Sequence, residues 1–243
     1  MSLLLSTAYL PPLDYFAAMA RDASLAGEIS PASVVLEACE HFSKQTWRNR
    51  CTILTASGPE SLLVPIQHSF PGGGGDGNVS HIPIREVRID YSTDWVRLHR
   101  QAIASAYGTS AYFEYYRDGL FAILDSGEER LYRLNRTLLD WLLDRLHLPA
   151  SITESRSFLP PAPADRFAGL HSDRDGLVAA MGEVRDLRGR IHPKKAPCYV
   201  CRKPYYQIFS EKYGFVQGLS VLDLLFNEGP DSLSVLAEMV PVQ

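Results

Sequence analysis

The sequence predicts one α/β domain over residues 1–243, with a mixed β-sheet from the N-terminal half covered by helices of the central and C-terminal segments (94–147 and 205–239). Two observations predict this fold: the chain begins with the pattern of strand, helix and strand, and later segments have helical periodicity. No pattern repeats with a period of about 20 to 50 residues, which argues against solenoids and propellers. Hydrophobic residues make up 46% and charged residues 21% of the chain, which excludes wholesale disorder.

The first element is a buried strand. Residues 3–10 are apolar and the run stops at Pro11 and Pro12, which cannot donate ladder hydrogen bonds. We expect a helix from Asp14 to Ala23 and a second short strand at residues 34–36, where three apolar residues follow one another.

A hairpin, a loop and a half-exposed strand are expected next. The β-rich runs 51–56 and 62–67 are separated by the turn-forming residues 57–60, which predicts a hairpin. The glycine-rich residues 71–78 are expected to form a flexible loop, since ordering glycines costs much conformational entropy. Residues 84–90 alternate apolar and charged side chains, which is typical of a half-exposed strand.

Three amphipathic helices follow, because apolar side chains now recur every three or four positions. We expect the first to end near Tyr107, the second to begin at Ser110, and the third to end before Pro149. Ser126 and Glu129 have the spacing of a capping box ahead of the third helix.

The C-terminal third begins with an irregular connection. Residues 158–176 are rich in Pro, Ala, Asp and Arg, which predicts a segment without regular structure. Residues 219–226 predict a helix that Ser220 and Asp223 would cap. Gly229 and the proline after it end this helix, and a last amphipathic turn follows.

Charge and composition limit the partners. A net charge of −4 argues against a nucleic-acid partner, so any anion site must be a local patch. No stretch of about 18 apolar residues occurs, so we expect no membrane span. The chain begins without a basic leader segment, and four cysteines are too few for a disulfide scaffold, so we expect a cytoplasmic protein.

The first candidate site is the basic segment 44–50. On a helix, Lys44 and Arg48 would share one face, and the planar guanidinium group matches phosphate or carboxylate. This predicts a local anion site. The alternative is a salt-bridged surface, with Arg50 bonded to Glu37 or Glu40.

The second candidate is the pair Trp95 and His99, which lie four residues apart and so on one helical stripe, with Tyr107 further along it. A histidine is suited to act as a general base near neutral pH. The alternative is a core histidine that bonds to a neighbouring backbone group.

The third candidate is a basic loop with His192, Lys194 and Lys195, which nearby prolines stiffen so that less entropy is lost on binding an anion. The alternative is a solvated loop. Cys198 and Cys201 follow, but one Cys-x-x-Cys motif is half of a zinc site, so we expect no metal.

Several segments occur in a characteristic order along the chain. They are Tyr9-Leu-Pro-Pro12, Lys44-Gln-Thr-Trp-Arg-Asn-Arg50, Trp95-x-x-x-His99, Tyr107, Tyr112-Phe-Glu-x-Tyr116, Ile191-His-Pro-Lys-Lys195, Lys203-Pro-Tyr-Tyr-Gln207 and Ser220-Val-Leu-Asp-Leu-Leu-Phe-Asn-Glu-Gly-Pro230. In these segments the chain resembles the WbqC-like protein family over nearly its whole length. The resemblance implies a bacterial protein whose relatives are often encoded with surface-polysaccharide and O-antigen genes, where acyl or aminoacyl transfer to an amino sugar is suggested.

The function expected from these observations is a cytoplasmic transferase that modifies a nucleotide-linked amino sugar by direct transfer between two bound substrates. His99 would be the general base, and His192 would steady the acceptor or the developing negative charge. The expected substrate-binding residues are Tyr9, Lys44, Arg48, Asn49, Arg50, Tyr107, Lys194 and Lys195. No particular cofactor is indicated. The alternative is a non-catalytic module that binds a sugar nucleotide or acidic ligand and partners a biosynthetic enzyme.

Overall fold

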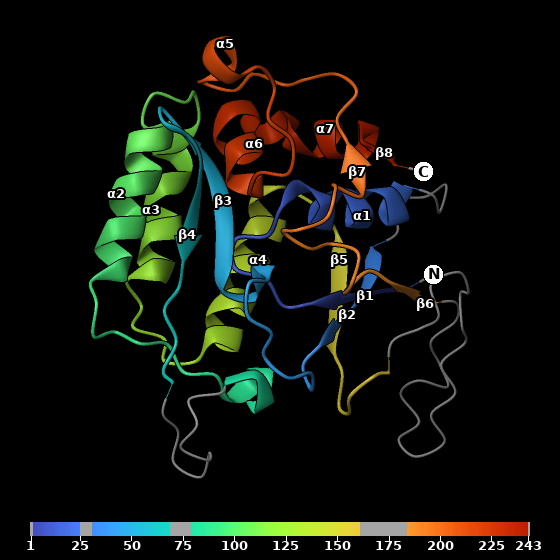
Figure 1. The fold of residues 1–243 in the computed structure, drawn as a ribbon. Coiled ribbons are helices and arrows are strands. Elements are labelled where there is room, and N and C mark those ends of the chain that lie inside the picture. Colours follow the sequence, from blue (N-terminus) through green and yellow to red (C-terminus); the bar gives the residue numbers. More distant parts are fainter. Residues whose placement is uncertain (1, 25–30, 69–78, 161–183, 243) are drawn as a thin grey trace.

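A four-stranded parallel sheet with the strand order β5-β2-β1-β6 forms the centre of one half of the protein (Figure 1). Its strands are β1 (Ser2–Ser6), β2 (Ala32–Glu37), β5 (Ala150–Glu154) and β6 (Val184–Asp186). All three neighbouring pairs are parallel. The structure is a computed structural model that describes residues 2–24, 31–68, 79–160 and 184–242.

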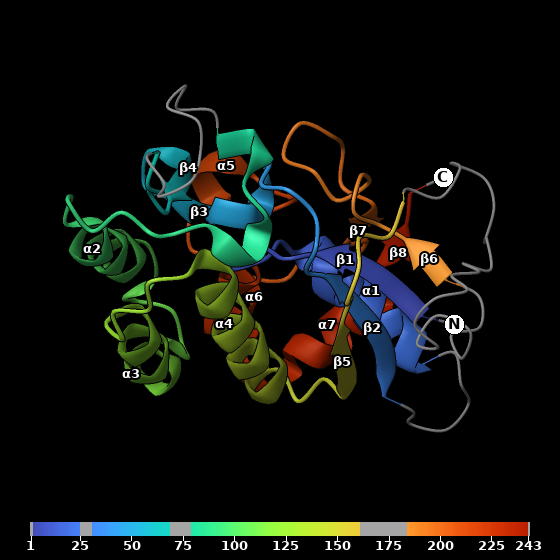
Figure 2. The ribbon, with the colours of Figure 1, turned by 90° about the horizontal axis from the view of Figure 1, so that it is seen from below.

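The two faces of the sheet are both apolar, because alternate residues of each strand point to opposite sides. Leu3 and Leu5 of β1 belong to the main core, whereas Leu4 joins a smaller cluster on the opposite face with Val35, Leu159 and Val184. On the main-core face, helix α1 (Leu13–Ser24) lies against β2, and α7 (Ser232–Glu238) packs on α1. Figure 2 shows the strands in front of these two helices.

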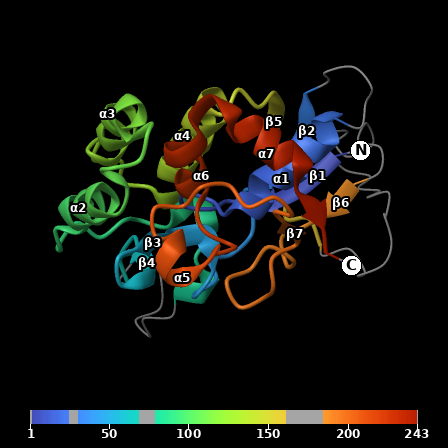
Figure 3. The same cartoon turned by 90° about the horizontal axis from the view of Figure 1, so that it is seen from above.

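An antiparallel hairpin of β3 (Arg50–Thr55) and β4 (Gly58–Leu63) forms the centre of the other half. Helix α2 (Trp95–Tyr107) packs on β3, α3 (Phe113–Leu124) contacts α2, and α4 (Leu131–Arg145) packs on α3. Helix α6 (Val221–Glu228) contacts both β3 and α1, so it joins the hairpin to the sheet, as the view from above in Figure 3 shows.

The remaining elements are short. They are the 3₁₀ helices η1 (Trp47–Asn49), η2 (Val79–His81), η3 (Ile84–Glu86) and η4 (Gly229–Asp231), the helix α5 (Ser210–Tyr213), and the antiparallel strands β7 (Tyr199–Val200) and β8 (Val240–Pro241).

The α/β class is confirmed, and so are the strand–helix–strand start, the hairpin, the three central helices and the helix after Leu219. That last helix begins as its cap predicts, because the Ser220 hydroxyl accepts a hydrogen bond from the amide of Leu222. It ends at Gly229, whose φ of 53° few other residues adopt.

The expected composition of the sheet differs from the structure. The main sheet is parallel and not mixed, and β5 and β6 come from beyond residue 149. Neither strand has a strong pattern: β5 is a half-exposed edge strand, and β6 has three residues. The helices of 94–147 pack around the hairpin, while α1 lies on the sheet because it connects the parallel strands β1 and β2.

The expected strand at 84–90 was wrong. Pro83 leads into η3, and the amide of Ile84 bonds to the carbonyl of Glu40 outside any ladder. Only isolated bridges follow, such as Ile89 with Ile66. The alternating pattern arises because Val87 and Ile89 are buried between exposed or half-buried residues of an irregular segment.

Two turns also differ from expectation. The hairpin turn consists of two residues, 56–57, because Gly58 already pairs with Thr55 and its φ of 107° is open to glycine. The box of Ser126 and Glu129 does not cap α4, which begins later, at Leu131. The expected loop 71–78 and residues 161–176 of the expected connection lie outside the described residues.

Candidate functional site

All four strands of the parallel sheet end in a polar residue. Ser6 ends β1, Glu37 ends β2, Glu154 ends β5 and Asp186 ends β6. Since the strands are parallel, these four residues lie along one edge of the sheet. In open α/β sheets this carboxyl edge is where ligands bind, at the point where the strand order reverses.

The reversal lies between β1 and β6. From β1 the chain proceeds to β2 and β5 on one side, and β6 then pairs with the other side of β1. A cavity of about 20 Å³ lies there, which is room for a group the size of a water molecule. It is lined by residues 5–8 at the end of β1 and just after it, by residues 46–48, and by Arg188 and His192 after β6.

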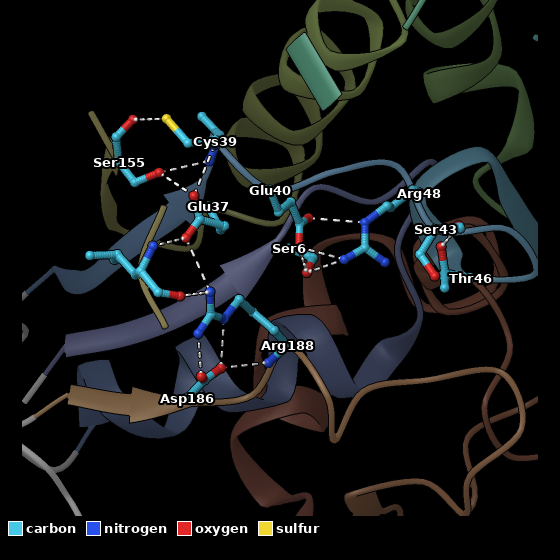
Figure 4. A network of polar contacts seen from close by, with 12 residues as sticks. Ser6, Glu37, Cys39, Glu40, Ser43, Thr46, Arg48, Ser155, Asp186 and Arg188 are labelled. Atoms are coloured by element: carbon cyan, nitrogen blue, oxygen red, sulfur yellow. Dashed lines mark hydrogen bonds and ion pairs between the residues drawn. The ribbon is translucent and has the colours of Figure 1, made fainter. Parts of the chain in front are cut away.

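Arg48 is held at this cavity by a buried ion pair with Glu40 (Figure 4). Its Nε lies 2.9 Å from Glu40 Oε1, and its Nη2 lies 3.0 Å from Ser6 Oγ. The Ser6 hydroxyl in turn donates to Glu40 Oε2 at 3.1 Å. The side chains of Arg48 and Glu40 are only 12% and 8% exposed, so removing one leaves the other charge desolvated.

A second ion pair adjoins the first. Arg188 donates from Nη1 to Glu37 Oε2 at 3.1 Å and from Nη2 to Asp186 Oδ2 at 2.6 Å (Figure 4). Glu37 is completely buried and also accepts from the Ser155 hydroxyl at 2.6 Å and from the amide of Leu159 at 2.8 Å. This network fixes the ends of β2 and β6 and the segment after β5 relative to one another.

His192 reaches the same cavity from the basic loop. Its Nδ1 accepts a hydrogen bond from the amide of Lys194 at 3.1 Å, so the neutral ring carries its proton on Nε2. Partial burial, followed by the charges of Lys195, Lys194 and Arg48, lowers the pKa of His192. His192 is therefore a neutral hydrogen-bond donor among cations, and not a free base.

The structure thus brings together the first and third candidate segments at Arg48 and His192. Lys194 and Lys195 are exposed on the same loop as His192. The convergence could not be read from the sequence, because it depends on the pairing of β6 with β1.

The expected helix over residues 44–50 was wrong. Gln45 has a left-handed φ of 57°, which an α-helix does not accommodate, and only the short η1 follows. Lys44 is exposed and shares no helical face with Arg48. The buried amide of Asn49 donates to the carbonyl of Val64, and Arg50 Nε is buried without a partner among the described residues.

His99 lies in the core, apart from the cavity. Its Nδ1 is 2.8 Å from the hydroxyl of Tyr9, it also bonds to the backbone of Leu63, and its ring meets that of Trp95 edge-on. Burial lowers the pKa of His99 to about 4. The single site expected to contain Arg48 and His99 is therefore not formed, and the core arrangement of His99 is the one observed.

Tyr107 belongs to a second buried polar cluster. Its hydroxyl accepts from the amide of Leu54 at 3.3 Å and bonds to Asp223. Asp223 also accepts from the hydroxyl of Tyr205 at 2.6 Å and from Gln207 Nε2 at 2.8 Å. Burial raises the pKa of Asp223 to about 6, because none of these partners is a cation. The Asp223 side chain is therefore used in this cluster and does not cap α6 as expected.

The site residues that sequence reasoning missed are Ser6, Glu37, Glu40, Ser155, Asp186 and Arg188. For Ser6 and Glu37 a signal existed: each is the first polar residue after an apolar strand run. Among the described residues, no group of three His, Cys, Asp or Glu side chains is arranged to hold a metal ion. No helix in that part of the chain is long and apolar enough to span a membrane.

Comparison with known proteins identifies relatives of the chain. The model of the WbqC-like protein family matches residues 7–174. The chain belongs to the WbqC-like protein family. This WbqC-like chain is also 28% identical over 199 residues to the uncharacterized protein Rv1507c of Mycobacterium tuberculosis (strain ATCC 25618 / H37Rv), an alignment that covers 79% of this chain and 81% of the relative. No solved structure matches it significantly.

The match places one wall of the cavity inside the family region and the other outside it. Of the lining residues, Arg48 lies within residues 7–174, whereas Ser6 lies before them and Arg188 and His192 lie beyond them. In this WbqC-like protein the cavity therefore depends on residues that the family model does not cover.

Proposed function

We propose that this WbqC-like protein is a cytoplasmic transferase that modifies a nucleotide-linked amino sugar, by acyl or aminoacyl transfer, in bacterial surface-polysaccharide biosynthesis. One observation carries the proposal: two basic segments far apart in the sequence meet in a cavity at the carboxyl edge of a parallel sheet. The anionic part of the substrate would lie at the mouth of this cavity.

The donors for an anion come from both walls. Nε and Nη2 of Arg48 bond to Glu40 and Ser6, which leaves Nη1 for a ligand. Nε2–H of His192 is a second donor, and Lys194 and Lys195 supply positive charge from the loop. Guanidinium, imidazole and ammonium groups together favour a phosphate or carboxylate group over a neutral one.

In the transfer itself, the amine of the acceptor sugar attacks the carbonyl carbon of the donor ester or thioester. The new C–N bond replaces the C–O or C–S bond, and the leaving group takes the proton that the amine releases. The negative charge that develops on the carbonyl oxygen would be stabilised by Nε2–H of His192 in a partly desolvated site, while Nη1 of Arg48 and the lysines of the loop hold the anionic part of the substrate. His99 takes no part, because it is enclosed in the core.

A non-catalytic module that binds a sugar nucleotide or acidic ligand and partners a biosynthetic enzyme is the second candidate. The hydrogen bonds of the two imidazole rings favour this candidate. Nδ1 of His192 accepts from the amide of Lys194, and His99 bonds to Tyr9 and to the backbone of Leu63. Neither ring offers a free basic nitrogen to an acceptor amine.

Thermal unfolding with a panel of ligands tests the proposal. The panel holds nucleotide-linked amino sugars, acyl-CoA thioesters and aminoacyl donors. A ligand of the folded state at about a hundredfold excess over its Kd should raise Tm by several degrees. The increase should be smaller in His192→Gln and Lys195→Gln, and unchanged in Lys212→Gln on α5, which serves as the matched control.

Mass spectrometry of the mixed ligands then separates the two candidates. A sugar that has gained the mass of an acyl or aminoacyl group supports the transferase, whereas stabilisation without product supports the binding module. If no member of the panel raises Tm, or if His192→Gln responds like the unmodified chain, the site at the cavity is wrong.

A further inference from the structure

A second, larger recess lies beside the edge strand β5. Its volume is about 520 Å³, within the range of about 300 to 1,000 Å³ that is usual for small-molecule sites. Four arginines line it, Arg85, Arg130, Arg133 and Arg136, together with the carboxylates of Glu128 and Glu154. We call it the arginine cleft. It shares no lining residue with the cavity near His192.

Helix α4 supplies most of the charge of the arginine cleft. Arg130 immediately precedes the helix, and Arg133 and Arg136 follow at intervals of three residues, so the three side chains lie along one face. Arg85 of η3 and Glu154 at the end of β5 form the opposite wall. The amide of Leu131 in the first turn of α4 bonds to the carbonyl of Val87, but the positive end of the helix dipole still favours an anion here.

The positive charge of the cleft is only partly neutralised. Arg85 pairs with Glu154 at 2.7 Å, and both side chains remain partly exposed. Arg136 pairs with Asp140 at 3.0 Å on the outer surface of α4. Arg133 is exposed and has no ion-pair partner in the described part of the chain. In a chain with a net charge of −4, this local excess of cations is unusual.

One donor in the cleft is both buried and unpaired. Nη1 of Arg136 is buried without a hydrogen-bond acceptor among the described residues, although its Nη2 bonds to Asp140. Leaving an N–H of a charged group buried and unpaired is costly, so such an atom calls for an acceptor from outside the chain. Nη1 is closed to solvent in this conformation, so the Arg136 side chain would have to turn toward the cleft; a phosphate oxygen there would then satisfy it and would also reach Arg133, one helical turn away.

We propose that the arginine cleft binds the phosphate groups of a phosphorylated small molecule, with Arg133 and Arg136 as the principal ligands and Arg85 shared between the phosphate and Glu154. A diphosphate fits best, because the four arginines that line the cleft outnumber the carboxylates of Glu128, Glu154 and Asp140 beside them. The arginine cleft is separate from the proposed transferase site. Its binding of phosphate groups can be measured whether or not the protein is a transferase.

Isothermal titration calorimetry with the full chain at low ionic strength tests the site, with inorganic pyrophosphate, inorganic phosphate and succinate as probes. Pyrophosphate should bind most tightly. Arg133→Gln and Arg136→Gln should each weaken its binding about tenfold, the effect of one charge-assisted hydrogen bond. Arg145→Gln is the matched control, because Arg145 lies on the same helix, pairs with Asp144 and does not line the cleft.

The exposed Arg133 also allows a charge reversal that does not threaten folding, and Arg133→Glu should abolish pyrophosphate binding. His192→Gln should leave it unchanged, so a failure of the proposed transferase site does not alter this result. The proposal is overturned if pyrophosphate does not bind, if succinate binds equally well, if Arg133→Gln keeps the original affinity, or if Arg145→Gln loses as much as Arg133→Gln.

Discussion

The hydroxyl oxygen of Tyr9 lies 2.8 Å from Nδ1 of His99, although 90 residues separate them in the sequence. Tyr9 follows strand β1 of the parallel sheet, and His99 lies on α2, which packs on the hairpin. The two side chains thus connect the two halves of the main core, and both are buried. Their hydrogen bond explains how a histidine can be stable in the core without charge.

This burial predicts that the chain becomes less stable in acid. The pKa of His99 is about 4 in the folded state and about 6.5 in an unfolded chain, so the unfolded state binds the proton first. The stabilisation is present above pH 6.5 and is lost as the pH falls towards 4, by about 3 kcal/mol. Urea unfolding at pH 7.5 and pH 4.5 should show this loss in the original chain and not in His99→Gln. The exposed His81→Gln is the control, and an equal loss in His99→Gln would contradict the interpretation.

For Asp223 we expect the opposite dependence of stability on pH: its burial makes the folded state less stable as the pH rises. Its pKa of about 6 lies above the usual 3.8, so the folded state keeps the proton to higher pH and is destabilised by ionisation. Between pH 4.5 and 7.5 the stability of Asp223→Asn relative to the original chain should rise by about 2 kcal/mol. Differential scanning calorimetry at the two pH values measures the change. A constant difference would mean that the pKa of Asp223 is not raised in the folded state.

The ion pair of Arg48 and Glu40 should show strong coupling. Arg48→Met or Glu40→Gln alone should lower the free energy of unfolding by about 3 to 5 kcal/mol, since each leaves a desolvated partner. The double variant should lose less than the sum of the two. A double-mutant cycle by urea unfolding measures the coupling, and additive losses would show that the charges are well solvated.

Glu37 should control the order of the segment after β5. It accepts hydrogen bonds from Ser155 and from the amide of Leu159, and it pairs with Arg188. In Glu37→Gln we expect faster hydrogen exchange at the Leu159 amide, because the acceptor loses its charge. Exchange in α2, away from this network, serves as the control. Unchanged protection of Leu159 would show that this segment is held by other contacts.

The sequence predicted the local elements better than the site. The apolar runs that begin at residues 3 and 34 and the three-to-four periodicity of α2, α3 and α4 depend on neighbouring residues, so they could be read directly, although the first strand ends at Ser6 and not at residue 10. β6 has three residues and could not be predicted from the sequence. Its pairing with β1 nevertheless brings Arg188 and His192 to the cavity. A strand this short has too few residues for a periodic signal.

The roles of individual charged residues depend on the same distant contacts. Arg48 and Arg50 look alike in the sequence, but Glu40 pairs with Arg48, while Nε of Arg50 stays without a partner in the described part of the chain. The i, i+4 spacing of Trp95 and His99 correctly predicted a shared stripe. Whether that stripe faced a ligand or the core was decided by Tyr9, which no local pattern connects to it.

The position of β1 between β2 and β6 has a consequence during synthesis on the ribosome. β1 is made long before β6, since residues 2–6 precede residues 184–186 in the chain. Until then the nascent chain can pair one edge of β1 with β2, and the backbone groups of the other edge have no strand from their own chain. Open edges of this kind are where strands of different molecules pair, so β6 closes a site of possible aggregation when it is added.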